Sequence, residues 1–304
     1  MTYNNEQFHS FPAPAKLNLF LHIIGQRSDG YHQLQTIFQF LDHSDTLEIK
    51  VIEGSNIELL TPIEGVPNED NLIVKAARLL QKHIQQSAKN TYPLPLGAQI
   101  RITKILPMGG GLGGGSSNAA TILLALNTLW HANLPLDELA QLGLSLGADV
   151  PIFIHGFSAF AEGVGEELTP VHPQEHWFLV SKPDVSISTA SVFTSPDLTR
   201  DTPKVNLIDD ITKLDIDLCH NDCQTLVIKE YPEVAKLLAW LVEYAPSRMT
   251  GTGACIFSRF DTEKEARRIQ SLLPSGIMSF VAKAVNTSPL RSAIDSLYAL
   301  QESN

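Results

Sequence analysis

The sequence predicts an α+β protein of two domains, with a mixed α/β amino-terminal domain and a carboxyl-terminal α/β sandwich. Strands and helices mix through the first half, and the second half runs strand, helix, strand, helix, strand, as in ferredoxin-like folds. A glycine run between a strand and a helix predicts an anion site in the first domain. The 304 residues suffice for two domains, and a hydrophobic fraction of 43% suffices for sizeable cores.

Three strands are predicted in the first half, over residues 14–23, 45–52 and 98–106. The third alternates most clearly, because Ile100 and Ile102 are separated by polar residues. Three helices are predicted there too. The first covers residues 71–86 and carries a stripe of Leu72, Ala76, Leu79, Leu80 and His83.

The second helix of this half is predicted over residues 116–130, with Ser116 or Ser117 as its cap. The third is predicted over residues 136–146 and is expected to end at Gly147.

The second half is predicted to hold strands over residues 177–183, 248–260 and 279–285, and helices over 231–244 and 261–273. The join between the halves is poorly marked. The proline- and histidine-rich stretch 169–176 is the best candidate, which puts the domains at residues 1–170 and 171–304.

Composition excludes several classes of protein. The formal net charge of -11 argues against a nucleic-acid partner. No apolar run is long enough to span a bilayer, and the first residues lack the pattern of a secretory signal. Cys219, Cys223 and Cys255 cannot all pair within the chain, so we expect free thiols and a cytoplasmic location. No zinc-like spacing accompanies them, and no metal site made of protein ligands is predicted.

The strongest signal is the glycine run, in which six of the seven residues from 109 to 115 are glycine. Backbone N–H groups of such a loop, together with the start of the following helix, can bind phosphate. A flexible linker would not be flanked so closely by a strand and a helix. The loop lacks the lysine of a Walker A motif, and its match to the dinucleotide pattern carries little information because glycine is so dense. The expected nucleotide-binding residues here are Pro107, Met108, Gly109, Gly110, Gly111, Leu112, Gly113, Gly114, Gly115, Ser116 and Ser117.

Taken with two other segments, this loop resembles the second motif of the GHMP kinase superfamily. PAPAKLNLFLHIIGQRSDGYHQLQT resembles the first motif and SRMTGTGACIF the third, and the match runs in order over residues 13–289. The variant GLGGGSSNAA, with Asn118 before Ala119, is similar to the branch that acts on diphosphocytidyl methylerythritol. The resemblance implies the two-domain GHMP-kinase fold, with an amino-terminal ATP-binding and catalytic domain and a carboxyl-terminal substrate-binding domain.

Two residues are candidates for the chemistry. Lys16 and Asn18 share one side of a predicted strand, and a lysine among apolar neighbours would need an anionic partner. Asp149 lies in an apolar stretch and could be that partner. A solvated strand lysine and a helix-capping or turn aspartate are the plainer alternatives. The resemblance implies that Asp149 is the base, that Lys16 is its electrostatic partner, and that the glycine loop holds ATP with Mg²⁺.

The resemblance also implies a substrate site. Tyr31 and Phe193 would stack on a cytosine, and His32 would pair with its polar edge. Thr189 would hold the diphosphate or polyol, and Asn18 would also contact the substrate. Asn71 and Lys104 would form the adenine-side wall. From the residues alone, the segment around Tyr31 could equally be a surface turn with this ring packed down.

The reaction implied is phosphorylation of the 2-hydroxyl of a substrate carrying cytidine diphosphate, in the non-mevalonate route to isoprenoids. The chain is expected to be a monomer or a weak homodimer. Three alternatives remain open: another GHMP kinase acting on homoserine, mevalonate or a sugar; a nucleotide-binding regulator without turnover; and a nicotinamide-dependent dehydrogenase.

Overall fold

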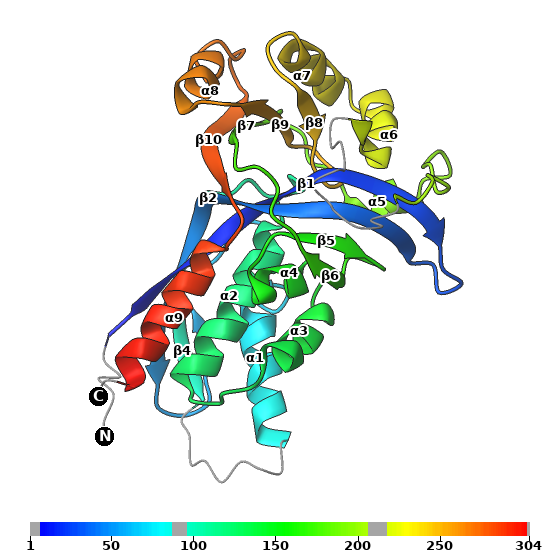
Figure 1. Ribbon diagram of the computed structural model, residues 1–304. Helices are drawn as coiled ribbons and strands as arrows, with labels where there is room; N and C mark the ends of the chain where they lie inside the picture. Colours follow the sequence, from blue (N-terminus) through cyan, green and yellow to red (C-terminus); the bar gives the residue numbers. More distant parts are fainter. Residues whose placement is uncertain (1–6, 87–95, 206–217, 303–304) are drawn as a thin grey trace.

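The computed structural model describes residues 7–86, 96–205 and 218–302. The expectation that the chain starts without a secretory signal concerns in part the first six residues, which lie outside the described ranges. In the described part of the chain ten strands form one sheet, covered by two separate groups of helices (Figure 1). Its main path runs β3-β4-β2-β10-β7-β9-β8, and β1 and β5 also pair with β2. None of the described helices has the length and apolar character that crossing a membrane requires.

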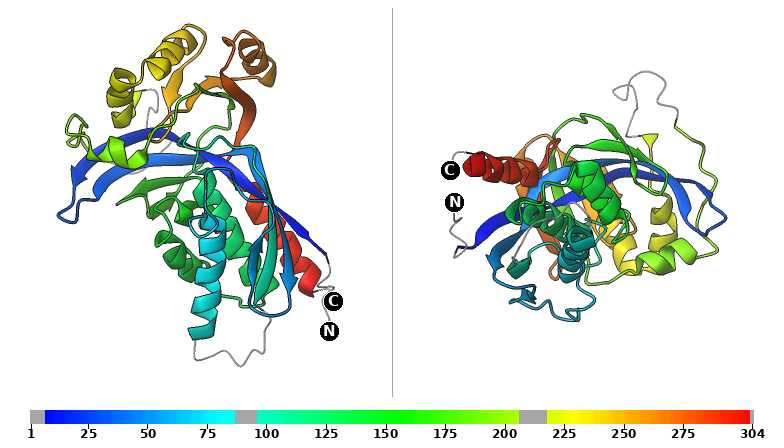
Figure 2. Two further views of the ribbon diagram at one scale, coloured as in Figure 1. Left: turned by 180° about the vertical axis from the view of Figure 1, so that it is seen from behind. Right: turned by 90° about the horizontal axis from the view of Figure 1, so that it is seen from below.

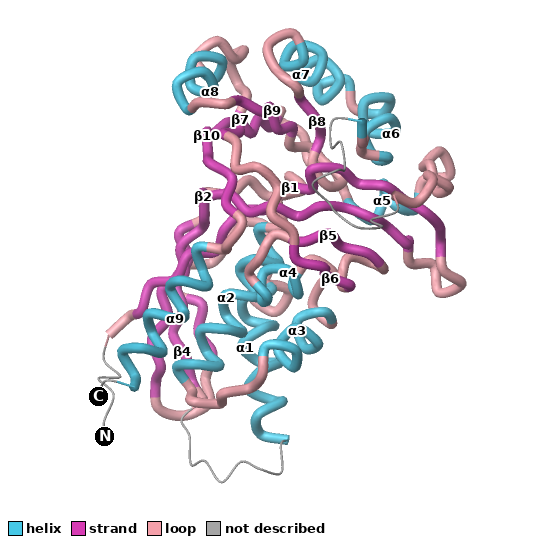
Figure 3. The backbone as a smooth tube through the Cα atoms, in the orientation of Figure 1, coloured by secondary structure: helices cyan, strands magenta, loops and turns pink. Residues whose placement is uncertain are grey.

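Two long antiparallel strands, β1 (His9–Gln26) and β2 (His32–Ile52), run across the whole molecule (Figures 2 and 3). Both extend well beyond the predicted ranges of 14–23 and 45–52. The first part of β2 was missed because polar side chains such as Gln35, Thr36 and Gln39 are buried there, which hides the alternation. This pair of strands lies between the two groups of helices and faces both.

The first group of helices packs on β2 and β4 (Gly97–Thr103). Its members are α1 (Leu72–Gln86), α2 (Gly114–Leu129), α3 (Leu136–Leu144), α4 (Val150–His155) and α9 (Pro289–Glu302). Three short strands complete this half: β3 (Ile57–Leu59), β5 (Ala159–Glu162) and β6 (Glu167–Pro170). Helix α2 is buried almost all round, which explains why its sequence is largely apolar.

Three details of these helices differ from the prediction. The cap of α2 is Gly113, with φ of 72°, because the chain turns into the helix at that glycine; Ser116 and Ser117 lie inside the first turn and do not cap it. Helix α3 ends at Leu144 and not at Gly147, since the N–H groups of residues 146 and 147 both bond the Gly143 carbonyl in a tightened last turn. The buried face of α1 consists of Ile73, Val74, Ala76, Ala77, Leu80 and Ile84, which is wider than the predicted stripe and rotated from it.

The second group of helices covers a four-stranded part of the sheet. In chain order its elements are β7 (Trp177–Lys182), α5 (Thr189–Thr194), α6 (Asp222–Glu230), α7 (Pro232–Val242), β8 (Ser247–Met249), β9 (Ile256–Phe260), α8 (Glu263–Gln270) and β10 (Met278–Val285). The strand order β10-β7-β9-β8, all antiparallel, is that of a ferredoxin-like sandwich, as predicted. The single strand predicted over residues 248–260 is wrong, because glycines at positions 251 and 253 take positive φ and split it into a hairpin.

The two halves are joined through the sheet and through a shared core. Strand β10 pairs with β2 at Phe40 and Leu41, and a third hydrophobic cluster lies beneath that junction. Leu112, the one residue in the glycine run that is not glycine, is buried in this cluster and anchors the loop. Helix α9 returns to pack in the first core. The domain limits at residues 170 and 171 stay a prediction.

Candidate active site

A cleft of about 1000 Å³ opens where the glycine loop, β1 and the starts of α1, α4 and α5 converge. It collects nearly all the residues predicted from the sequence. Those that line it are Lys16, Asn18, Tyr31, His32, Asn71, Lys104, residues 107–116, Asp149, Thr189 and Phe193. Of the predicted residues, Ser117 alone does not line it, because its side chain is fully buried.

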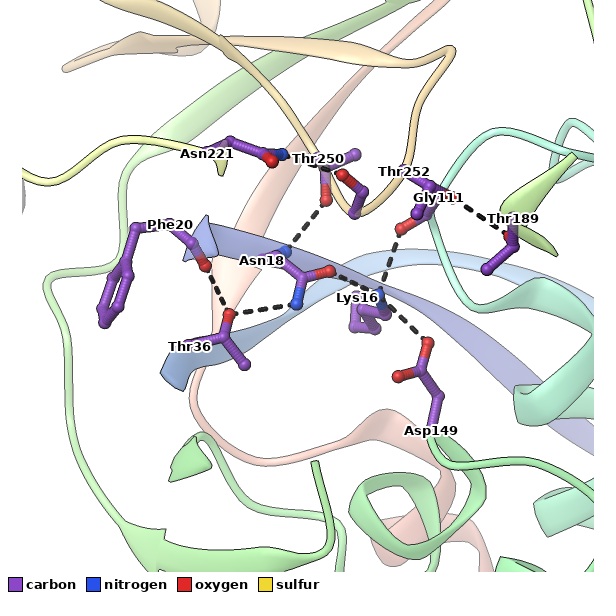
Figure 4. Close-up of polar contacts among 11 residues, drawn as sticks. Lys16, Asn18, Phe20, Thr36, Gly111, Asp149, Thr189, Asn221, Thr250 and Thr252 are labelled. Atoms are coloured by element: carbon purple, nitrogen blue, oxygen red, sulfur yellow. Dashed lines mark hydrogen bonds and ion pairs between the residues drawn. The ribbon is translucent and has the colours of Figure 1, made fainter. Parts of the chain in front are cut away.

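At the centre of the cleft, the ammonium group of Lys16 contacts three oxygen atoms (Figure 4). They are Asn18 Oδ1 at 2.6 Å, the Gly111 carbonyl at 3.1 Å and Asp149 Oδ2 at 3.1 Å. An ammonium group has three donors, so all of them are used. The side chain of Lys16 is 3% exposed, and the anionic partner predicted for a buried lysine is therefore present.

The backbone of β1 holds these groups in place. A register shift between Pro14 and Lys16 frees the Lys16 N–H to donate to the Leu112 carbonyl at 3.0 Å. The N–H of Asn18 donates to Thr250 Oγ1 at 2.9 Å. The Asn18 side chain also donates to Thr36, which in turn donates to the Phe20 carbonyl. The irregular strand thus bonds to both loops that form the cleft.

Asp149 occupies the N-cap position of α4, but its side chain makes no capping hydrogen bond. The plainer interpretation of this aspartate is therefore right about its position and wrong about its contacts. One carboxylate oxygen, Oδ2, is bound by Lys16, and no hydrogen bond to Oδ1 is found among the described residues. The side chain is 34% exposed, so Asp149 faces the cleft with one oxygen available to a ligand.

A neighbouring turn, residues 250–255, explains part of the glycine content of the loop; it lies within the segment that resembles the third motif. The carbonyls of Gly109 and Gly110 accept from the N–H groups of Ala254 and Cys255, each at 3.2 Å. A Cβ atom at Gly110 would lie 2.5 Å from the Cys255 sulfur. The two glycine-containing segments are therefore packed backbone to backbone, which side chains would prevent.

The loop ends at the amino terminus of α2, where the first N–H groups of the helix have no partners within the helix. Such groups, with the helix dipole behind them, favour a bound anion. Ser116 and Lys104 line the cleft beside this position. The three positive-φ glycines, Gly109, Gly111 and Gly113, give the chain the sharp curvature that brings the loop over the cleft.

Asp45 is a residue of the site that the sequence analysis missed. It is fully buried and accepts from Lys104 Nζ at 2.5 Å, from the N–H groups of Ile105 and Leu106 at 2.8 Å each, and from Asn118 Nδ2 at 3.1 Å. It thereby holds both ends of the glycine loop. Its place in the alternation of the predicted strand was the signal that could have revealed it, because Asp45 falls in line with Leu47, Ile49 and Val51 on the apolar face.

The far end of the cleft contains the predicted base-binding residues in an unexpected arrangement. The ring of His32 stacks on Phe193, with centroids 5.1 Å apart, whereas Tyr31 is 63% exposed. Arg200, which the sequence analysis did not single out, donates to His32 Nε2 at 3.0 Å. Burial and then the nearby Arg200 charge lower the pKa of His32. Between this end and the centre, Thr189 and Thr252 hydrogen bond at 3.0 Å.

Comparison with known proteins gives consistent matches along the chain. The model of the GHMP kinases N terminal domain matches residues 71–157, and that of the GHMP kinases C terminal domain matches residues 207–275. The 4-diphosphocytidyl-2-C-methyl-D-erythritol kinase of Colwellia psychrerythraea is 64% identical over 292 residues, which are 94% of this chain and 93% of that protein.

Solved structures agree with these matches. A crystal structure of 4-(cytidine 5'-diphospho)-2C-methyl-D-erythritol kinase is similar, with a TM-score of 0.75 and 28% identity, and the match covers 90% of this chain and 98% of the other. Mevalonate kinase of Methanococcus jannaschii shares the fold, with a TM-score of 0.64 and 16% identity over 92% of this chain and 99% of its own.

Proposed function

The chain belongs to the GHMP kinases, and from this we propose that it transfers the γ-phosphoryl group of ATP to the 2-hydroxyl of 4-diphosphocytidyl-2-C-methyl-D-erythritol, a step towards isoprenoid precursors. The observation that carries the proposal is the contact between Lys16 and Asp149 at the centre of a cleft with an anion-binding loop on one side and an aromatic subsite on the other. The 64% identical relative supports the choice of substrate.

Asp149 acts as the general base in this proposal. Its second oxygen accepts the proton of the substrate hydroxyl while the hydroxyl oxygen attacks the γ-phosphorus, and ADP leaves as the bond to its β-phosphate oxygen breaks. Lys16 stabilises the negative charge that develops on the transferred group. Because Lys16 is held from three sides, little reorganisation is needed during the reaction.

The glycine loop and the start of α2 bind the phosphates of ATP in the proposal, with Asn71 and Lys104 on the adenine side. Asn71 lines the cleft and is almost fully buried, and its Nδ2 has no hydrogen-bond partner among the described residues. A buried amide without a partner is costly, and a ligand acceptor would satisfy it. Asp45 orients Lys104, whose charge suits the neighbouring phosphates.

We also propose that ATP binds together with Mg²⁺. Magnesium in such sites takes most of its ligands from phosphate and water and only one or two from the protein. The hydroxyl of Ser116, which lines the cleft, fits that limited role. When bound, the ion would neutralise charge on the phosphates of ATP.

At the substrate end, Tyr31, His32 and Phe193 receive the cytosine in the proposal, while Thr189 and Asn18 hold the part of the substrate that lies between the base and the reacting hydroxyl. The hydrogen bond between Thr189 and Thr252 crosses that path and would be exchanged for bonds to the ligand. Tyr31→Ala is expected to raise the Michaelis constant for the cytidine substrate about tenfold, since base stacking is worth about 1–3 kcal/mol. An unchanged constant would remove Tyr31 from the subsite.

The experiment that tests the proposal is a coupled ADP-release assay with Mg²⁺ and ATP. It compares the diphosphocytidyl substrate with homoserine, mevalonate and galactose, and includes ATP alone. Turnover on the cytidine compound only is the expected result. Turnover on another alcohol would keep the catalytic pair and reject the substrate, and binding of ATP without any turnover would favour a regulator. The cytoplasmic location and the monomeric or weakly dimeric state are parts of the proposal that fractionation and light scattering test.

A further inference from the structure

Arg200 lies at the far end of the cleft, beside Tyr31, His32 and Phe193. Figure 1 places α5, which carries Phe193, next to the outer end of the β1–β2 pair. In an enzyme that handles phosphate, an arginine in the cleft suggests a phosphate ligand. The hydrogen bonds that Arg200 makes point to another role.

Most of the donors of Arg200 are already used. Nη2 donates to the carbonyls of Phe193 at 3.1 Å and Ser195 at 2.7 Å, and Nη1 donates to that of Leu198 at 3.0 Å. Nε donates to His32 Nε2 at 3.0 Å. Four of the five N–H groups of a guanidinium are thereby engaged. Arg200 therefore ties the carboxyl end of α5 to the first residue of β2 and keeps little capacity for a phosphate.

The bond to His32 determines the state of the imidazole ring. A guanidinium nitrogen can only donate, so Nε2 of His32 must carry a lone pair and the ring must be neutral with its hydrogen on Nδ1. The lowered pKa of His32, caused first by burial and second by Arg200, is consistent with a neutral ring. Among the described residues no hydrogen bond to Nδ1 is found, so His32 has one unused N–H donor at the base-binding end of the cleft.

The same arginine also sets the position of the aromatic wall. It holds the backbone of Phe193 through the carbonyl oxygen, and the ring of Phe193 stacks on His32 with an interplanar angle of 29°. One residue thus controls the direction of the His32 donor and the plane of the ring beside it. The direction of a hydrogen-bond donor and the plane of a stacking ring are the two properties by which such a site recognises a flat heterocycle.

We propose that Arg200 is a specificity-determining positioning residue, which holds His32 as the neutral Nδ1–H tautomer so that the subsite prefers cytosine to uracil. The ring nitrogen N3 of cytosine accepts a hydrogen bond, whereas N3 of uracil carries a hydrogen. A single fixed N–H donor facing that nitrogen satisfies the first base and opposes the second. This inference rests on the proposed function, because it concerns the base of the cytidine substrate.

The tautomer can be tested without turnover. In protein labelled with ¹⁵N-histidine, the two nitrogens of His32 are identified by NMR from the signals lost in His32→Gln. The wild-type chain is expected to show a hydrogen on Nδ1 and none on Nε2 at pH 7. Arg200→Met is expected to give a mixture of tautomers and to raise the pKa of His32 towards its usual value. Arg291→Met, which removes an exposed arginine, should leave the His32 signals unchanged.

Selectivity is tested by calorimetric titration of the full chain with CDP and with UDP. The wild-type chain should bind CDP more tightly than UDP by about tenfold or more, and Arg200→Met should lose about tenfold in CDP affinity and most of the preference. Arg200→Lys keeps the charge but cannot span His32 and three carbonyls, so it should lose the preference for CDP over UDP as Arg200→Met does. In turnover, Arg200→Met should raise the Michaelis constant for the cytidine substrate about tenfold and change kcat less than threefold.

The outcomes separate the two proposals. If CDP binds the wild-type chain but His32 carries its hydrogen on Nε2, the inference about Arg200 is wrong while the proposed function stands. An undiminished preference for CDP in Arg200→Met or in Arg200→Lys would overturn the inference in the same way. If the wild-type chain shows the expected tautomer but does not bind CDP, the proposed substrate is wrong and the selectivity falls with it. Should Arg200→Met not fold, the wild-type tautomer and Arg200→Lys still decide.

Discussion

Gly111 lies against the carbonyl oxygen of Thr250 so closely that a Cβ atom at Gly111 would be 2.2 Å from that oxygen. This relationship joins the glycine loop to the turn at 250–255, and it explains why the two motifs occur together. Gly111 also has a φ of 74° and provides one of the three oxygens that hold Lys16. Its substitution therefore disturbs the contact and the catalytic pair at once.

Gly111→Ala is predicted to lower the free energy of unfolding by about 3 kcal/mol or more, measured by urea denaturation, and to abolish turnover. Gly54→Ala is the matched control, since Gly54 has a φ of 86° and nothing within 4 Å of the added carbon. Because this control introduces backbone strain alone, Gly54→Ala should lower the free energy of unfolding by about 1–2 kcal/mol and retain turnover. Equal losses in the two variants would show that the contact with Thr250 is unimportant.

Asp149→Asn is predicted to reduce kcat by about 10²–10⁴-fold, because an amide cannot accept the hydroxyl proton. The Michaelis constants should change little, whereas the unfolding midpoint should fall, because the amide leaves the buried charge of Lys16 without its anionic partner. Asp197→Asn removes the carboxylate of another lysine–aspartate pair, at 2.5 Å on the surface, and should leave kcat unchanged. Full turnover by folded Asp149→Asn would exclude this residue as the base.

Asp45→Asn is predicted to cost about 2–4 kcal/mol of stability and to raise the Michaelis constant for ATP. The new amide nitrogen would face donors of Lys104 or Asn118, so hydrogen bonds that place the glycine loop would be lost. Thermal unfolding and steady-state kinetics measure the two effects. Asp42→Asn changes an exposed carboxylate that accepts from the N–H of Lys283. It should lower the free energy of unfolding by less than about 1 kcal/mol and leave the Michaelis constant for ATP unaltered.

Cys223 and Cys255 are predicted to resist alkylation in the folded protein. Burial raises the pKa of each thiol to about 12, so only about one in 10⁴ is a thiolate at pH 8 even if reagent could enter. Iodoacetamide followed by mass spectrometry should label both cysteines rapidly in urea and very slowly without it. Rapid labelling of Cys255 in native protein would mean that the turn at 250–255 opens away from Gly110.

Stability is predicted to fall as the pH is lowered from about 7 to about 5. Burial is the main cause that lowers the pKa of five histidines, namely His9, His22, His32, His43 and His155. Below the usual pKa of about 6.5, histidines of the unfolded chain bind protons that the same histidines in the folded chain do not. The stability that these neutral histidines contribute above that pH is therefore lost as the pH falls. Urea midpoints at several pH values measure this effect. His43→Gln should reduce the slope, and an unchanged slope would exclude His43 as a contributor.

The amino-acid sequence by itself determined the two-domain fold, the family and a set of site residues that, apart from Ser117, all line the cleft. Local signals sufficed for the elements and for the glycine loop, because strand alternation, helical periodicity and a glycine run between a strand and a helix each express the physics of a short segment. The family and the residues on the substrate and adenine sides came from the resemblance of three motifs to the GHMP kinases. The limits of the helices were less predictable. Gly113, and not a serine, caps α2, because the geometry of the turn before it decides where the helix starts.

Only the tertiary structure decided which distant groups meet. The contact of Lys16 with Asp149, the burial of Asp45 beneath the glycine loop and the bond from Arg200 to His32 all join separate parts of the chain. No local pattern encodes such contacts, because the residues around a polar side chain in the sequence do not indicate which distant residue will contact it. Burial makes an unpaired charge costly, and the fold is what supplies its partner.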